Sequence, residues 1–236
     1  MSDGPGAHTP SLNRACPQDL SLEKILLRSF MKYGYTELQG CNSFWELVAM
    51  GQQFGLPTRL LDWTYSPLVA AHFATEDIDY YDRDGVIWCV NIEDVNANLP
   101  PSLRQKLSEQ RADIFTRDIL EDVAHNFTSL QALSDQPFAL FFEPASTVNR
   151  IANQYALFSA VSDPAVTLLD LPESECFVRL IISKKAKLEI RDKLDYINIS
   201  ERMIYPGLDG ICRWIARRYA PLGPRYNAEH AKEEQP

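Results

Sequence analysis

The segment 55–74 constrains this chain most, because it combines helix-breaking residues, opposite charges and a tryptophan among apolar neighbours. Its first half reads GLPTRLLDWT and its second half reads YSPLVAAHFA. A surface loop would not hold two adjacent leucines at its centre, and a buried strand would not hold both an arginine and an aspartate. We therefore predict an extended apolar strand over 58–64 that ends in a polar loop and runs directly into a helix.

Local signals at both ends of this strand indicate where helices stop and start. Gly55 suits the left-handed position after a helix that we expect from Ser43, and Pro57 forbids the continuation of that helix. Ser66 and Pro67 fit the N-cap and the first position of the next helix. The segment is thus expected to read helix, turn, strand, short loop, helix.

The polar residues of the strand predict a ligand site. Side chains alternate along a strand, so Asp62 and Thr64 should lie together at its end, beside the free N–H groups of the following helix. Helix N-termini attract anions such as phosphate, and Trp63 offers a flat face for a base or a nicotinamide-like ring. Asp62 and Thr64 are candidate catalytic residues, and Arg59, Trp63 and Ser66 are candidate ligand-binding residues.

A second polar group occurs in the segment 148–159. If this segment is helical, Arg150, Asn153 and Gln154 share one face, which is most simply the solvated side of the helix. Gln154 nevertheless stands among apolar residues, which predicts a buried amide that needs partners. We add Gln154 to the candidate catalytic residues, and Arg150 and Asn153 to the candidate ligand-binding residues.

A purely structural interpretation of the same residues stays open. Arg59 and Asp62 can form a buried ion pair, with Trp63 in the core and Thr64 as a cap residue. His72 lies in an apolar helix and is interpreted as a core or groove histidine. The four histidines are dispersed and the five cysteines lack CxxC spacing, so we expect no metal site and reduced thiols in a cytoplasmic protein.

Composition limits the class of protein and of partner. With 45% hydrophobic and 11% aromatic residues, the chain can bury a sizeable core. A net charge of −9 gives no overall attraction to nucleic acid or to anionic membranes. We therefore expect a small-molecule nucleotide or a macromolecular acceptor as partner, with no membrane contact, and nothing in the charge indicates nucleic acid.

The pattern of strands and helices predicts an α+β fold, a small mixed sheet flanked by helices. We expect an N-terminal loop over 1–19, a single domain over 20–220 and a disordered tail over 221–236. Within the domain, the charged helical segment 102–133 has sparse apolar residues, and we expect it to lie outside the main core as an insertion.

The run QQFGLPTRLLDWT at 52–64, followed by SPLVA at 66–70, closely resembles the signature of the FRG domain family. Three other segments agree with that family: PSL at 10–12 with Arg14, RI at 150–151 with Asn153 and Gln154, and the segment 204–211. The resemblance covers about 10–219. The Phe-Arg-Gly tripeptide that gives the family its name is expected before Pro10. It does not occur there, so we expect that the start of the domain is truncated or that the chain has lost that strand.

The resemblance implies a function only through a further analogy, to ADP-ribosyltransferases. Those enzymes carry an arginine strand, then a hydroxyl-bearing strand that enters a helix, then a later Gln or Glu. The analogy implies that Thr64 and the helix at Pro67 hold the ribose and phosphate of NAD, the hypothetical substrate, while Gln154 orients the ribose or the acceptor. A non-catalytic module that binds a nucleotide or a protein, and a structural remnant without a ligand, are the alternatives.

Overall fold

The computed structural model describes residues 10–15, 22–144 and 149–220. Most of the loop expected over 1–19, and the whole tail expected over 221–236, lie outside the described residues. Within 10–15 the chain forms a short helix, α1 (Ser11–Ala15), where a loop was expected, and its Leu12 is fully buried.

Within the described residues, three α-helices precede the first strand, helices separate several of the strands that follow, and three α-helices come after the last strand. The other helices are α2 (Leu22–Tyr33), α3 (Phe44–Gln53), α4 (Pro67–Thr75), α5 (Ile92–Ala97), α6 (Pro101–Gln110), α7 (Arg117–Val123), α8 (Phe127–Gln131), α9 (Asn149–Asn153), α10 (Lys187–Tyr196), α11 (Glu201–Ile204) and α12 (Leu208–Tyr219). The strands are β1 (Leu61–Thr64), β2 (Gly85–Val90), β3 (Phe115–Thr116), β4 (Ala139–Glu143), β5 (Ala156–Val161) and β6 (Phe177–Ile182).

The strands form two small sheets. The main sheet has the order β1-β5-β4-β3, antiparallel except for the parallel pair β3 and β4. The second sheet is an antiparallel ribbon of β2 and β6. The prediction of a small mixed sheet flanked by helices in an α+β fold is confirmed.

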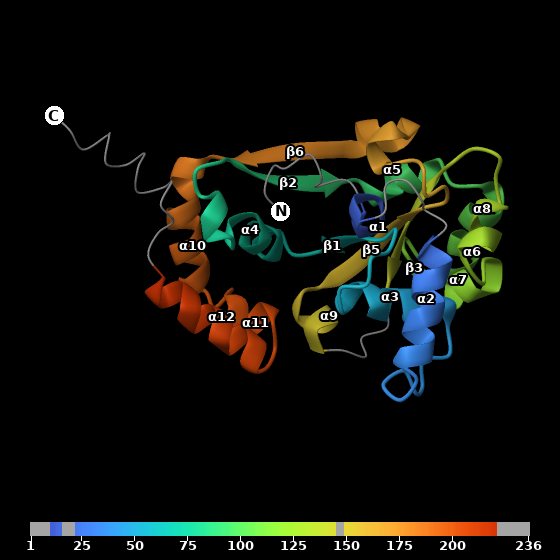
Figure 1. Ribbon diagram of the computed structural model, residues 1–236. Coiled ribbons are helices and arrows are strands. Elements are labelled where there is room, and N and C mark those ends of the chain that lie inside the picture. Colours follow the sequence, from blue (N-terminus) through green and yellow to red (C-terminus); the bar gives the residue numbers. More distant parts are fainter. Residues whose placement is uncertain (1–9, 16–21, 145–148, 221–236) are drawn as a thin grey trace.

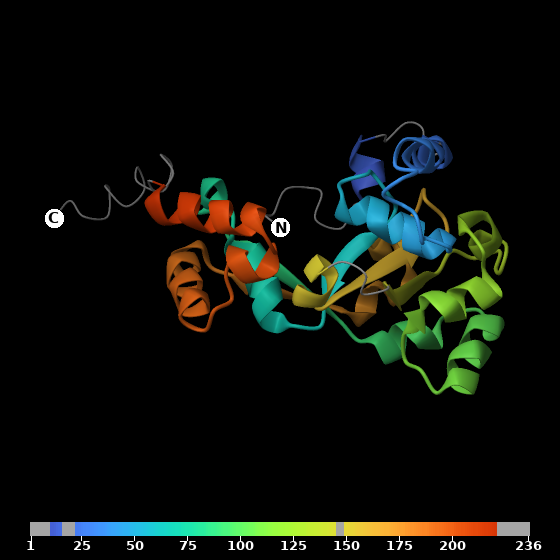
Figure 2. The same cartoon turned by 90° about the horizontal axis from the view of Figure 1, so that it is seen from below.

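Helices gather at the two ends of the molecule. Figure 1 shows α2, α3 and α6–α8 around the main sheet, and α10–α12 with α4 at the opposite end, where α4 packs on α10 and β2. The view in Figure 2 shows the same separation from below. In the described part of the chain, no helix combines the length and the apolar composition needed to cross a bilayer.

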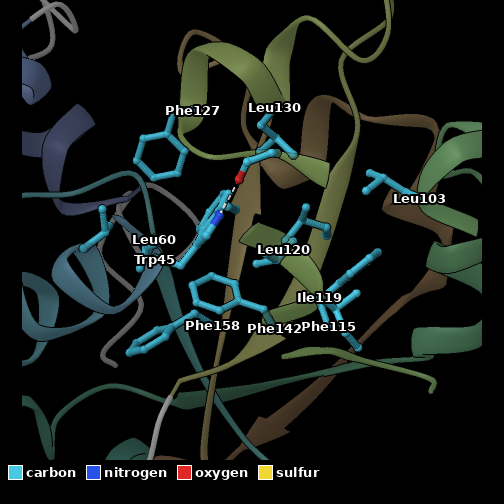
Figure 3. Close-up of a cluster of buried hydrophobic side chains, with 14 of the residues drawn as sticks. Trp45, Leu60, Leu103, Phe115, Ile119, Leu120, Phe127, Leu130, Phe142 and Phe158 are labelled. Atoms are coloured by element: carbon cyan, nitrogen blue, oxygen red, sulfur yellow. Dashed lines mark hydrogen bonds between the residues drawn. The ribbon is translucent and has the colours of Figure 1, made fainter. Parts of the chain in front are cut away.

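The largest hydrophobic core is centred on Trp45 of α3 (Figure 3). The Trp45 indole Nε1 donates a hydrogen bond to the carbonyl of Ala124 at 2.7 Å, and its ring meets Phe127 and Phe142 edge to face, both with centroids 5.4 Å apart. The polar atom of a buried tryptophan is thereby satisfied while its area packs against other rings.

The segment 102–133 does not lie outside the core, so that expectation was wrong. Its apolar side chains form a large part of the Trp45 cluster: Leu103, Leu107, Phe115, Ile119, Leu120, Phe127 and Leu130. They are sparse in the sequence because each short helix turns a single narrow stripe toward the sheet, and the charged residues between them face solvent.

The strand β1 begins at Leu61 and not at Thr58 as expected. The backbone before it is bonded elsewhere: the Thr58 N–H donates to Ser11 Oγ at 3.1 Å, the Arg59 N–H to Glu23 Oε1 at 3.1 Å and the Leu60 N–H to Thr58 Oγ1 at 3.1 Å. Because side chains take these N–H groups, the backbone is satisfied without a sheet partner.

Candidate functional site

A cavity of about 400 Å³ lies on β1, the edge strand of the main sheet. Its other walls come from the helices α3, α4 and α9, from β5, from the ribbon of β2 and β6, and from Leu168 and Leu169. Four aromatic residues belong to its apolar lining: Trp63, Phe73, Trp88 and Phe177. Pockets of a few hundred Å³ with apolar walls and a few polar groups are typical sites for small molecules.

Asp62 lines this cavity, and a neighbouring amide holds it in place. Gln52 Nε2 donates to Asp62 Oδ2 at 2.9 Å, and Gln52 Oε1 accepts from the Thr58 hydroxyl at 2.6 Å. Because the Gln52 amide oxygen accepts from the Thr58 hydroxyl, the NH₂ group of the same amide points toward the Asp62 carboxylate. The Gln52 side chain is therefore oriented by the segment that precedes β1.

The Asp62 carboxylate is reached by water, although protein surrounds it on most sides, as expected for a group inside a cavity. Burial raises the pKa of Asp62 above its ordinary value, while the hydrogen bond from Gln52 and the charges of Arg150 and Arg14 act in the opposite direction. A carboxyl with a raised pKa in a cavity is a candidate functional group.

Thr64 and Gln154, both predicted as site residues, meet in the structure. The Thr64 hydroxyl donates to the backbone carbonyl of Gln154 at 2.7 Å, and both residues line the cavity. The Gln154 side chain is 7% exposed and its Nε2 donates to the carbonyl of Ile204 at 3.3 Å. The predicted buried amide with partners is thus present, and it joins α9 to the end of α11.

The start of α4 has the predicted caps but does not line the cavity. Ser66 Oγ accepts from the Val69 N–H at 3.3 Å, and Pro67 occupies the first turn. The cavity meets α4 at Ala70 and Phe73, farther along the helix. An anion held by the first turn of α4 would therefore lie outside this cavity.

Arg59 forms an ion pair with Glu23 of α2 rather than with Asp62. Its Nε and Nη2 donate to Glu23 Oε2 at 2.8 and 2.6 Å, and its Nη1 donates to the carbonyl of Ser162 at 3.1 Å. The guanidinium lies 4.0 Å from the centroid of the Phe127 ring, and Arg59 is 8% exposed. Arg59, which was predicted to bind a ligand, therefore lies on the core side of the segment and not in the cavity lining.

The remaining predicted residues are divided between the cavity and the frame around it. Arg150 lines the cavity, donates to the carbonyl of Gln53 at 3.4 Å and stacks 5.0 Å from the centroid of the Tyr205 ring. Asn153 instead donates to the carbonyl of Met203 at 2.7 Å and holds α9 against α11. Trp63 lines the cavity, and its Nε1 donates to Ser159 Oγ at 2.8 Å.

Residues 7–83 of the chain match the family model of the FRG domain. This segment is therefore similar to the FRG domain. The match includes α3, β1 and α4, and ends before α9. The comparison with curated proteins and the comparison with solved structures each gave no match.

The segment that matches the FRG model contributes one cavity residue that the sequence did not single out, Glu76. Its Oε2 accepts a hydrogen bond from the Tyr205 hydroxyl at 2.8 Å and lies 3.2 Å from Nε2 of His72. Burial and the Glu76 carboxylate raise the pKa of Tyr205, so its hydroxyl stays protonated and donates. The i, i+4 spacing of His72 on α4 and Glu76 at the C-cap of that helix was the available signal for this contact.

The tautomer of His72 follows from its other neighbour. Arg191 of α10 places Nη1 at 2.8 Å from His72 Nδ1, and a guanidinium can only donate. Nδ1 of His72 therefore carries the lone pair, and Nε2 carries the proton and faces Glu76. The contact between Nε2 and Glu76 Oε2 is short, but its geometry is not that of a hydrogen bond. His72 is fully buried, so the prediction of a core or groove histidine agrees with its position.

Proposed function

We propose that this protein binds an NAD-like nucleotide, with the nicotinamide and its ribose inside the cavity. The observation that carries this proposal is the Asp62 carboxylate, which lies among aromatic walls with one oxygen held by Gln52. A planar ring can pack against Trp63 or Phe73, and ribose hydroxyls can donate to Asp62 and Glu76. The cavity volume suits one half of a dinucleotide better than the whole.

The charges around the cavity support this orientation of the ligand. Three carboxylates line it, those of Asp62, Glu76 and Asp77, against the single guanidinium of Arg150 among the described residues. Such a lining disfavours the two phosphates and favours the uncharged or cationic part of the molecule. The phosphates would then extend past Arg150 toward solvent.

The same arrangement supports ADP-ribosyltransferase-type chemistry as the reaction. The glycosidic C–N bond of the cationic nucleotide breaks, its electron pair passes to the ring nitrogen, and neutral nicotinamide leaves. Positive charge then builds on the ribose carbon, where Asp62 and Glu76 would stabilise it before a nucleophile of a macromolecular acceptor attacks. Thr64 and Gln154 would contribute by holding β1 against α9 at the edge of the site.

Calorimetry with NAD tests the proposal, using the wild type, Asp62→Asn, and Asp135→Asn as a control on an exposed carboxylate. We expect binding to the wild type and to the control, and about tenfold weaker binding to Asp62→Asn, because a hydrogen bond to a charged group is lost. A wild type that gives no heat with NAD would refute the proposal.

Release of nicotinamide from NAD separates the enzyme from the alternative function. Release that Asp62→Asn abolishes supports glycosyl transfer. Binding without release, in the presence of candidate protein acceptors, favours a non-catalytic nucleotide-binding module. The alternative is favoured by the Gln154 amide, which is bonded to Ile204 and so is not free to orient an acceptor.

A further inference from the structure

One hydrogen bond and one close contact hold the carboxylate of Glu76 in the cavity wall. His72 and Tyr205 both contact Oε2, and among the described residues no group bonds to Oε1. The Glu76 side chain is 29% exposed, so part of it remains open to the cavity. A carboxylate that is already fixed in position can act on a ligand without first being reoriented.

The partners of Glu76 are themselves fixed by buried contacts. Arg191 is 2% exposed, bonds to His72 Nδ1, and donates through Nη2 to the carbonyl of Ile199 at 2.6 Å. The Tyr205 ring has the guanidinium groups of Arg150 and Arg213 at 5.0 and 4.5 Å from its centroid. The position of the Glu76 charge is therefore set by α10, α11 and α12, outside the segment that matches the FRG family.

Two polar atoms of lining residues have no hydrogen-bond partner in the described part of the chain, Gln53 Oε1 and Arg150 Nε. Both atoms are closed to solvent, so they lie behind the cavity surface and a molecule in the cavity does not reach them. The groups that a ligand can reach are the exposed parts of the lining, and the Glu76 carboxylate is one of them.

We propose that the cavity selects a heteroaromatic ring with a permanent positive charge, an N-substituted pyridinium, and that Glu76 provides the charge that selects it. Aromatic faces attract cations, and the carboxylates of Asp62, Glu76 and Asp77 outnumber the guanidinium of Arg150. This inference rests on the proposed function for the identity of the ring as nicotinamide, and adds that the ring is recognised by its charge.

A matched pair of small probes tests the inference: 1-methylnicotinamide, which is a cation, and nicotinamide, which is neutral. NMR titration of the wild type should give an affinity for the cation at least about tenfold higher. In Glu76→Gln the cation should bind about tenfold more weakly, while nicotinamide should bind as before. Glutamine keeps an oxygen for His72 and Tyr205, so the surrounding contacts are preserved.

Glu93→Gln, on the exposed start of α5, is the control and should retain the wild-type preference. Equal affinity of the wild type for the two probes, or no binding of the cation up to its solubility limit, overturns the inference. A preference that Glu76→Gln leaves unchanged overturns the role of Glu76. Thermal melting checks that Glu76→Gln folds. If it does not fold, the affinities of the wild type for NAD⁺ and NADH are compared instead, and equal affinities overturn the inference.

The two proposals fail in different ways. If 1-methylnicotinamide binds in preference to nicotinamide but NAD does not bind, the nucleotide function is wrong and charge selection stands. If NAD⁺ and NADH bind equally well, nucleotide binding stands and charge selection is wrong. NADH carries a neutral ring on an otherwise matched molecule, so the ring charge is the main difference between the two ligands.

Discussion

Arg59 and Asp62 are three positions apart in one short segment, yet their surroundings are opposite. Arg59 is 8% exposed and has a carboxylate, a carbonyl and an aromatic ring around its guanidinium. Asp62 faces a cavity and accepts its hydrogen bond from the neutral amide of Gln52. The first residue ties the segment to α2, and the second is left available to a ligand.

This difference shows that a family signature can combine two tasks. The part before β1 is held by α1, α2 and α3 through Ser11, Glu23 and Gln52. The part within β1 uses that support to present Asp62 and Trp63 to the cavity. Arg59 has an oppositely charged partner and supports the fold. A carboxylate such as Asp62, whose charge is not paired with an opposite charge among the described residues, is characteristic of functional sites.

The largest effect is expected from breaking the Arg59 pair. Arg59→Met should lower the free energy of unfolding by about 3–5 kcal/mol, because Glu23 is left as a buried charge without its partner. Urea unfolding measures this loss. The double variant Arg59→Met/Glu23→Leu should recover part of it, and a loss below about 1 kcal/mol, as for an exposed pair, would contradict the structural role.

Trp63→Phe should have an intermediate effect and tests whether the cavity side of the segment also supports the fold. Ser159 is 1% exposed and would lose the indole donor at its hydroxyl, which is expected to lower stability by about 1–3 kcal/mol. Thermal and urea unfolding measure the change. Adding Ser159→Ala to Trp63→Phe should cause little further loss, and a fully additive loss would argue against this hydrogen bond.

Asp62→Asn is expected to have the smallest effect on stability, and in the opposite direction. The folded pKa of Asp62 lies above its ordinary value of 3.8, so between these two values the folded protein binds more protons than the unfolded chain. Wild-type stability should therefore fall as the pH rises through this window, and the lost stability is not regained at neutral pH.

Asparagine has no such proton to lose, so Asp62→Asn should be slightly more stable than the wild type at neutral pH and should show a flatter pH dependence. Unfolding measured across the window checks this, with Asp135→Asn as the exposed control. A variant that is less stable than the wild type at neutral pH would mean that the Asp62 carboxylate is a structural group.

Features whose causes lie within a few residues were predictable from the sequence. Ser66 caps α4, Pro67 begins it, and Gly55 follows α3 in the left-handed conformation, all as predicted. Capping and turn formation are local, so their signals are complete in the sequence. The α+β class and the signature of the FRG domain were accessible for the same reason.

The partners of the charged and polar residues, in contrast, became known from the packing of distant elements. Arg59 bonds to Glu23 and not to the nearby Asp62, and Glu76 meets Tyr205 from a distant part of the chain. The segment 102–133 joined the core although its apolar residues are sparse. These contacts depend on how separate elements pack and on which buried charges need an oppositely charged partner. The local spacing of residues predicts neither.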